Sequence, residues 1–378
     1  MSVKVPLLVG SYTQGQKPLD YFTNNAAPDA GIVLVTLDTA DGSLSLTASA
    51  NGGTHPAYAT YNAATSTAYF TNENLDSGKV LALRVVQNTQ LKVLGTSQVV
   101  KGHPCYLGVS GSSLLCASYV SGEVTILPLK GDGSLAGPGI TVKLPTQGAT
   151  YPGPVAERQD GPHAHCFEPV GEGGFGLCCD LGSDRVYALS TTSGAVLSSA
   201  ELPPGCGPRH VAVNTAGTMA YVSTELGNTL CAVPLDPATG KLGAVVASAS
   251  ILPERYETPT TASHVELSPC GRVAYVGNRV GVGQDGGCAN AAEAAISVMS
   301  IADGALGLTQ FVPIGGKVAR GFCVVAGAGS TGVSGYLVVG AQESGFVATF
   351  AIDAATGKLR PTGQKLAVPS PAVVRPCF

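Results

Sequence analysis

Charged residues are scarce in this chain, and several features that mark membrane or nucleic-acid proteins are missing. Only 12% of the residues are Asp, Glu, Lys or Arg, Trp is absent, and the net charge is −4. No run of Lys and Arg occurs, which disfavours nucleic acid and anionic membranes as partners. No segment approaches the roughly 20 apolar residues of a membrane-spanning helix. The apolar start of the chain leads into a strand-like segment rather than a cleavage site, so we expect no signal peptide.

The cysteines lack the spacing of a disulfide framework or a zinc site. There are eleven, an odd number, and most lie inside apolar segments such as GLCCDLG and LLCASYV. None forms a CxxC pair, and the six histidines show no ligand spacing. We therefore expect free, buried thiols, no structural metal and a cytoplasmic location.

A polar turn followed by an apolar residue recurs seven times along the chain. Each turn follows a β-rich run such as GIVLVTL or FVATFAI, which is typical of a hairpin because Gly and Asn tolerate the positive φ of tight turns. The seven turns are Thr39–Leu44, Gln87–Leu91, Gly131–Leu135, Thr191–Val196, Asp236–Leu242, Ala302–Leu306 and Asp353–Leu359.

Two further β segments accompany each turn, which gives four strands per repeat. The repeats advance by roughly 45–65 residues, the range of propeller blades. The first repeat lacks its opening strand, and the C-terminal segment PAVVRPCF can supply it and close the ring. We therefore predict an all-β, seven-bladed β-propeller with four antiparallel strands per blade. The ring is closed by N- and C-terminal strands, and residues 1–378 form a single domain.

Polar residues are concentrated at two positions in the repeats. In a propeller, the start of the innermost strand and the end of the second strand lie at the same mouth of the central channel. The first position holds His55, His103, His163, His165, Arg209, His210, His264 and Arg320. The second position holds Asn72, Glu73, Tyr119, Asp180, Glu225, Asn278, Arg279 and Gln342. Four insertions (14–30, 143–161, 252–262 and 280–292) belong to the same face, which predicts a small-molecule site there.

Several motifs resemble those of a known family. PHAHCFEP, GPRH, a TEL segment whose Glu follows sixteen residues after the Arg of GPRH, and GNR one blade later are similar to the lactonase-type seven-bladed propellers. This family includes bacterial 6-phosphogluconolactonases and fungal carboxy-cis,cis-muconate cyclases. The resemblance implies an active-site set of His163, Arg209, Glu225 and Arg279.

The chemistry of these side chains agrees with that set. Two arginines suit the planar recognition of a phosphate or carboxylate, with no cofactor. Lactone hydrolysis needs a base, an oxyanion donor and an acid. His163 or Glu225 can be the base, and Arg209 or Arg279 can stabilise the oxyanion. Weaker candidates for substrate binding are His210, Arg320 and Gln342, whereas His55, His103, His165 and His264 are expected to be structural. Arg and His at this mouth disfavour a bound cation, so we expect no metal.

Three functions stay open at this point. The first is metal-free hydrolysis of an anionic sugar lactone, above all 6-phosphogluconolactone to 6-phosphogluconate, a step of the pentose phosphate pathway. The second is 3-carboxy-cis,cis-muconate cyclisation, which the same four residues would suit. The third is a propeller that binds a partner without catalysis, because this fold hosts many functions.

Overall fold

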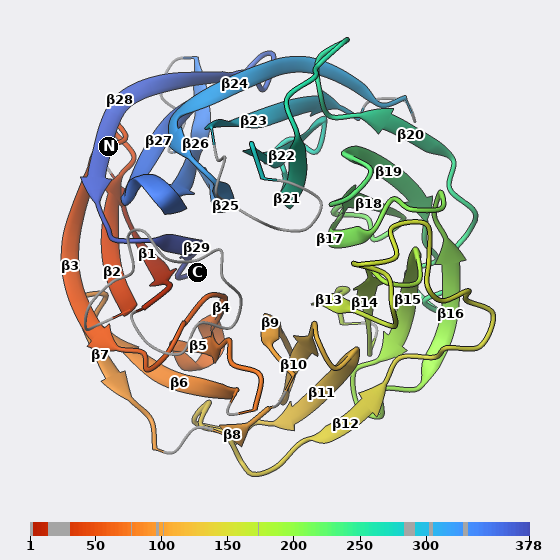
Figure 1. The fold of residues 1–378 in the computed structure, drawn as a ribbon. Helices are drawn as coiled ribbons and strands as arrows, with labels where there is room; N and C mark the ends of the chain where they lie inside the picture. Colours follow the sequence, from red (N-terminus) through yellow and green to blue (C-terminus); the bar gives the residue numbers. More distant parts are fainter. Residues whose placement is uncertain are drawn as a thin grey trace.

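The protein forms a ring of sheets around a central axis (Figure 1). The computed structural model describes residues 3–13, 31–76, 78–95, 98–100, 102–172, 174–282, 292–301, 305–327 and 332–378. Within these residues the strands make seven antiparallel sheets, and helix is confined to two 3₁₀ turns, η1 (Ala63–Thr65) and η3 (Gln342–Ser344). No helix of the described residues is long and apolar enough to cross a membrane. The predicted seven-bladed propeller is confirmed.

The blades follow one another along the chain, and within each the strands run in order from the innermost to the outermost. Blades one to three are β29 (Pro371–Pro376), β1 (Lys4–Ser11), β2 (Gly31–Asp38) and β3 (Leu44–Asn51); β4 (Ala59–Asn62), β5 (Thr67–Asn72), β6 (Lys79–Val86) and β7 (Gln90–Val93); β9 (Pro104–Ser110), β10 (Ser113–Ser118), β11 (Glu123–Pro128) and β12 (Ile140–Lys143). Blades four and five are β13 (Ala164–Pro169), β14 (Phe175–Asp180), β15 (Arg185–Ser190) and β16 (Val196–Glu201); β17 (Pro208–Val213), β18 (Met219–Thr224), β19 (Thr229–Pro234) and β20 (Ala247–Ser250). Blades six and seven are β21 (Thr260–Leu267), β22 (Val273–Val280), β23 (Glu293–Ser300) and β24 (Gly307–Lys317); β25 (Ala319–Ala326), β26 (Val333–Ala341), β27 (Phe346–Asp353) and β28 (Leu359–Ala367). Blade two has a short additional strand, β8 (Gln98–Val99), which pairs with β6.

The two ends of the chain close the ring, as we predicted because the first repeat lacks its own opening strand. The C-terminal strand β29 pairs antiparallel with β1, so that Leu8 lies opposite Arg375 and Val9 opposite Val374. This pairing covers the inner edge of β1, which would otherwise be open.

Burial along the strands explains why these segments form blades. The second strands β5, β14 and β22 are buried at every position, because both of their faces pack against neighbouring blades. The outermost strand β20 instead alternates between half-buried and exposed residues, as expected for one solvated face. The turns have the predicted chemistry: Asp236 accepts the Ala238 N–H at 2.9 Å, and Gly240 adopts φ +72°.

A β-bulge interrupts the pairing of the innermost and second strands in six of the seven blades. The register shifts at the same place in each, near the start of the innermost strand. The residues at the shifts are Cys105, His165, Arg209, Ser263–His264, Arg320–Gly321 and Ala372. Adjacent residues of a regular strand point to opposite faces, and a bulge relaxes this rule. As a result, Arg209 and His210 both line the channel.

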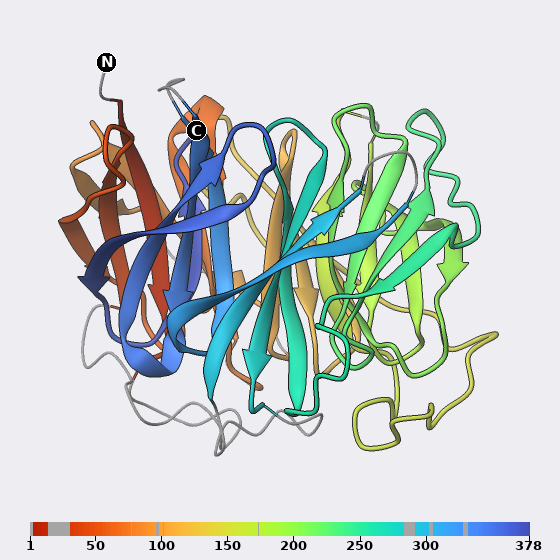
Figure 2. The same ribbon diagram turned by 90° about the horizontal axis from the view of Figure 1, so that it is seen from above.

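The described insertions gather on one face of the ring. In Figure 2, the segments 143–161 and 252–262 extend from the lower edge, whereas both chain ends lie at the upper edge. The channel opening on the first side is called the insertion mouth below, and that beside the chain ends the opposite mouth. The predicted insertion 14–30, and most of 280–292, lie outside the described residues.

The ten cysteines of the described residues are all free, as expected. Nine are buried, as expected for cysteines in apolar segments, whereas Cys270 is exposed and departs from the expectation of buried thiols. Cys270 lies in the SPCGR turn between β21 and β22, outside the packed blades, so that its side chain faces solvent.

Candidate active site

Three arginines surround one buried carboxylate at the insertion mouth. Glu225 follows β18, and its Oε2 lies 2.8 Å from Arg209 Nε and 2.9 Å from Arg279 Nη2. Its Oε1 lies 2.7 Å from Arg158 Nη2. All four side chains are largely or wholly buried. Three positive charges against one negative leave this group, called the arginine cluster below, with an excess of two positive charges.

The pKa values of Glu225 and Arg209 in the cluster are shifted strongly from their ordinary values. Burial opposes the ionisation of Glu225, but Arg279, Arg158 and Arg209 outweigh it and hold the pKa of Glu225 well below its usual range. Burial, together with the neighbouring Arg279, lowers the pKa of Arg209 to about 10. Glu225 is therefore ionised at neutral pH, and both of its oxygens are engaged by arginines, which argues against the role of base that the sequence offered.

Arg158 is a member of the cluster that sequence reasoning missed. It lies in the insertion 143–161, and its Nε and Nη2 donate to the Tyr119 hydroxyl at 3.2 and 3.0 Å. The insertion is thereby tied to the end of β10 and to Glu225. The signal available in the sequence was slight, namely an arginine inside an insertion already assigned to this face.

His163 lies beside the cluster rather than in it. Its ring stacks on Tyr119 at 4.6 Å between ring centroids, with 18° between the planes. Its Nδ1 lies 2.9 Å from the Tyr119 carbonyl oxygen, and its Nε2 lies 2.7 Å from Asp160 Oδ1. Because both partners are acceptors, both bonds form together only when each ring nitrogen carries a hydrogen. In that state His163 is a proton donor, which argues against a role as base.

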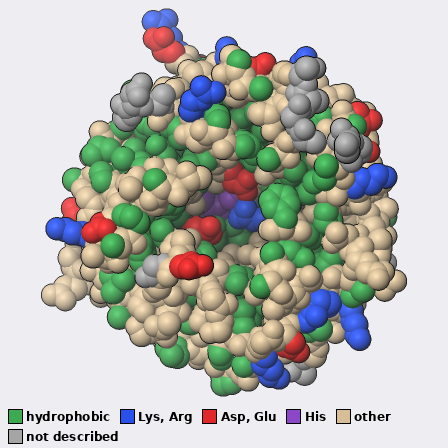
Figure 3. All heavy atoms as spheres, turned by 180° about the vertical axis from the view of Figure 1, so that it is seen from behind, with side chains coloured by type: hydrophobic (Ala, Val, Ile, Leu, Met, Phe, Trp, Pro, Cys, Tyr) green, Lys and Arg blue, Asp and Glu red, His purple; other side chains and the backbone are tan. Residues whose placement is uncertain are grey.

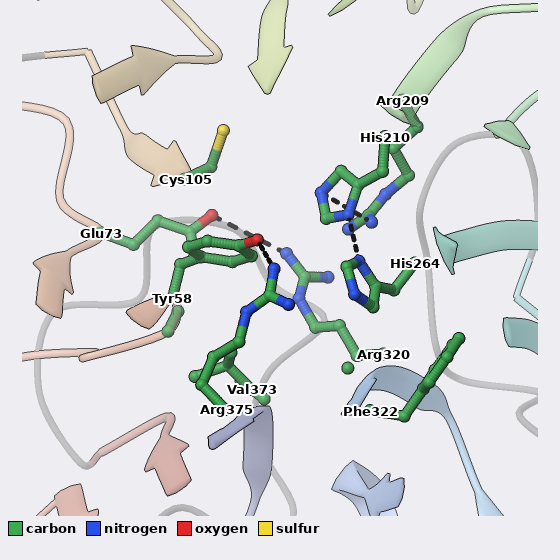
Figure 4. Close-up of a pocket in the computed structure, with 13 residues that line it drawn as sticks. Tyr58, Glu73, Cys105, Arg209, His210, His264, Arg320, Phe322, Val373 and Arg375 are labelled. Carbon is green, nitrogen blue, oxygen red and sulfur yellow. Dashed lines mark hydrogen bonds and ion pairs between the residues drawn. The ribbon is translucent and has the colours of Figure 1, made fainter. Parts of the chain in front are cut away.

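Two of the weaker candidates, His210 and Arg320, line a small cavity in the channel (Figure 4), together with Arg209, Glu73 and Cys105. Arg320 lies 3.8 Å from Glu73 Oε1. Burial raises the pKa of the Cys105 thiol well above its ordinary value, so that this sulfur is no nucleophile.

Gln342 is not among the residues that line this cavity. It is wholly buried, and its Nε2 donates to Glu343 Oε1 at 3.2 Å. Its Oε1 has no hydrogen-bond partner among the described residues. The same holds for two atoms at the cluster, Arg279 Nε and His165 Nδ1. Buried polar groups are normally paired, so these three atoms are exceptions among the described residues.

Two histidines expected to be structural belong to the polar interior of the channel. His165 Nε2 lies 3.9 Å from Glu225 Oε2, and His264 Nδ1 lies 2.7 Å from His210 Nδ1. Glu266 and Arg375 continue this interior toward the opposite mouth. The segment SHVEL carried a usable signal, because His264 and Glu266 are two residues apart and share a strand face.

No group of three or more His, Cys, Asp or Glu side chains that could hold a metal ion occurs within the part of the chain that the structure describes. The arginine cluster presents N–H donors around a single carboxylate. Such a set suits an anion rather than a cation.

Sequence comparison defines the class of protein to which this fold and site belong. The family model for lactonases with a seven-bladed β-propeller matches residues 6–376, and the chain belongs to this family. A 6-phosphogluconolactonase of Bacillus subtilis strain 168 is 28% identical over 372 residues, 97% of either chain.

Solved structures give the same picture. The periplasmic gluconolactonase PpgL of Pseudomonas aeruginosa superposes with a TM-score of 0.79 at 25% identity, over 100% of this chain and 99% of the other. A Lactobacillus plantarum protein superposes with a TM-score of 0.80 at 24% identity over all of both chains, which shows a shared fold.

Proposed function

We propose that the protein hydrolyses an anionic sugar lactone, with 6-phosphogluconolactone as the substrate that fits best. The observation that carries this proposal is the arginine cluster, with its excess of two positive charges at one mouth of the channel. Guanidinium groups recognise phosphate oxygens through paired hydrogen bonds. The Bacillus relative named as a 6-phosphogluconolactonase supports the same substrate.

The charged residues of the cluster then have two roles, substrate binding and positioning. Arg209 and Arg279 bind the substrate anion or the oxygen that becomes negative when water attacks the lactone carbonyl. Glu225 is a positioning residue, because its carboxylate holds Arg158, Arg209 and Arg279 in place. The Nε of Arg279, buried and unpaired among the described residues, is a donor ready for a substrate oxygen.

His163 is assigned to the leaving group. Opening the lactone releases a ring oxygen that needs a proton, and a His with both nitrogens protonated can supply it. Its bonds to Asp160 and to the Tyr119 carbonyl fix the ring at the rim of the site. Arg320 and His210, which line the channel cavity, are the further residues we expect substrate to contact.

The test is hydrolysis of freshly generated 6-phosphoglucono-δ-lactone, followed by acid release against the spontaneous reaction. We expect turnover far above the spontaneous rate. Absence of acceleration would overturn the proposal. If 3-carboxy-cis,cis-muconate were converted instead, the arginine cluster would serve a cyclase, and conversion of neither substrate would favour a binding protein.

A further inference from the structure

A continuous chain of hydrogen bonds runs down the channel from the arginine cluster to the opposite mouth. Arg209 Nη1 lies 3.2 Å from His210 Nε2, and His210 Nδ1 lies 2.7 Å from His264 Nδ1. His264 Nε2 lies 3.0 Å from Glu266 Oε1. Figure 4 shows the first two of these contacts between β17 and β21. We call His210, His264 and Glu266 the channel triad.

The groups at the two ends of this hydrogen-bond chain determine which nitrogen of each imidazole carries a hydrogen. Arg209 can only donate, so the His210 Nε2 must accept. A neutral His210 then carries its hydrogen on Nδ1 and donates it to His264 Nδ1. The hydrogen of His264 is left on Nε2, where it meets the carboxylate of Glu266.

The surroundings keep both imidazoles neutral. Burial, followed by the nearby Arg209, places the pKa of His210 well below its ordinary value. Burial, followed by Arg375, lowers the pKa of His264 to about 4. At neutral pH each ring therefore has one donor and one acceptor, as the hydrogen-bond chain requires.

The ring of His210 is fixed by neighbours from several blades. Its centroid lies 5.0 Å from those of Tyr106 and His264, 5.2 Å from that of His165 and 5.9 Å from that of Tyr58. All of these contacts are tilted or edge-to-face. Because the ring is held on so many sides, its Nε2 keeps its place beside Arg209 at the channel cavity.

Glu266 is held just as firmly at the other end. Its Oε1 also accepts from Arg375 Nη1 at 2.7 Å, and its Oε2 accepts the Val324 N–H at 2.7 Å. These bonds, with that from His264, lower the pKa of Glu266 against the effect of burial. A fixed, ionised carboxylate behind two imidazoles is the arrangement that orients a general base and stabilises its protonated form.

The triad also joins two cavities. His264 and Arg375 line both the channel cavity and a pocket at the opposite mouth, and Glu266 lines the second. Figure 3, seen from behind Figure 1, shows that mouth as a central hollow with acidic, basic and His side chains among hydrophobic ones. The side chain of Glu266 is 20% exposed there.

We propose that His210 is the general base of the lactonase, with His264 and Glu266 as its positioning residues. This inference rests on the proposed function. When Arg209 turns its N–H toward the substrate, His210 Nε2 is released and takes a proton from the attacking water, whose oxygen bonds to the lactone carbonyl carbon. The carbon–oxygen bond of the ring then breaks, and the ring oxygen takes up a proton from His210 or through His163. The second hydrogen of the water leaves to solvent as the product acid ionises.

The tautomers of His210 and His264 in the wild-type protein test this hydrogen-bond arrangement without any substrate. The chain has only six histidines, so ¹⁵N-labelled His gives a sparse NMR spectrum. We expect the hydrogen of His210 on Nδ1 and that of His264 on Nε2 at neutral pH. A hydrogen on His210 Nε2 would overturn the proposal, whatever the substrate.

Kinetics test the role in catalysis, and the opposite mouth offers a matched control. Glu168 is also partly buried and accepts a hydrogen bond from the Tyr106 hydroxyl at 2.7 Å, but among the described residues no hydrogen bond joins it to a His. We expect Glu266→Gln to lower kcat by about 10²-fold or more with little change in KM, since a well-placed base contributes 10²–10⁴-fold. Glu168→Gln should leave kcat within about threefold, and Glu266→Asp should recover most of the loss.

The outcomes separate this inference from the proposed function. Wild-type turnover of the phosphorylated lactone, with the same kcat and pH profile in Glu266→Gln as in Glu168→Gln, would overturn the triad alone. A wild type that does not hydrolyse the lactone would overturn the proposed function, and with it the role of His210 in opening the ring. Loss of kcat in Glu266→Gln, with most of the loss recovered in Glu266→Asp and kcat retained in Glu168→Gln, would support the triad in full.

Discussion

Glu225 and Arg209 are joined at 2.8 Å inside a site where both side chains are almost wholly buried. Their contact links adjacent strands of one blade, since Arg209 lies on a bulge of β17 and Glu225 directly follows β18. Each depends on the other, because a buried charge that loses its partner is costly. The pair is therefore both a structural element and the centre of the proposed site.

Replacing the carboxylate should damage stability and activity together. Glu225→Gln leaves three guanidinium groups without their counter-charge, so we expect a loss of about 3–5 kcal/mol in the free energy of unfolding. We also expect kcat to fall by about two orders of magnitude, because the arginines lose their positions. Denaturant unfolding and lactone hydrolysis measure the two effects.

Glu201 provides the control for this substitution. It pairs with Arg185 on the outer strands of blade four, and its side chain is 73% exposed. Glu201→Gln should change stability and activity little, since exposed ion pairs contribute little. An active, stable Glu225→Gln protein would show that the cluster does not need its carboxylate.

Arg279 should contribute to binding of the anionic group of the substrate. Arg279→Lys keeps a positive charge but loses the planar set of donors, so KM for the phosphorylated lactone should rise by about 10- to 100-fold. The exposed Arg272, directly before the same strand, gives the control Arg272→Lys, which should behave as wild type. Unchanged KM values in Arg279→Lys would remove this arginine from the anion site.

The buried histidines should make the folded state sensitive to mild acid. The pKa of His264 is about 4 in the folded protein and about 6.5 when unfolded. Between these values the unfolded chain binds the extra proton, so stability is fully present above pH 6.5 and is lost as pH falls toward 4. At pH 5, His264 alone accounts for about 2 kcal/mol.

His165 and His210, whose pKa values also lie well below the ordinary value, add to this loss. Denaturant midpoints at pH 7, 6 and 5 measure it. His264→Gln should flatten part of the decline, and an equally steep decline in that variant would contradict the assignment to His264.

Removal of metal ions should not affect the reaction. The proposed chemistry uses arginine donors and imidazole groups at the insertion mouth. Activity after EDTA treatment should stay within about twofold of the untreated protein. A loss that is restored by Ca²⁺ or Mg²⁺ would mean that an ion takes part, and the roles of Arg209 and Arg279 would need revision.

The fold could be predicted from the sequence because short segments of the chain indicate its strands and turns. Seven hairpin turns with Asp, Asn or Gly, β-rich runs on either side and an unpaired C-terminal segment sufficed to predict the blades and the closure of the ring by β29. The contact of Arg209, Glu225 and Arg279 was foreseeable from family motifs and from the rule that places strand ends at one mouth.

Other parts of the site depend on geometry that the sequence does not display. Arg158 comes from an irregular insertion, whose path no periodicity determines. The bulges that bring Arg209 and His210 to the same cavity appear only as register shifts between paired strands. Arg375 approaches Glu266 across two blades far apart in the chain, so only the closed ring places them together.

The most direct test of the central claim compares kcat/KM for 6-phosphoglucono-δ-lactone and for unphosphorylated glucono-δ-lactone, corrected for spontaneous hydrolysis. If the arginine cluster binds the substrate anion, the phosphorylated lactone should be favoured by about 10²-fold or more, consistent with about 1.5–3 kcal/mol for each charge-assisted hydrogen bond. Equal kcat/KM values for the two lactones would contradict the account.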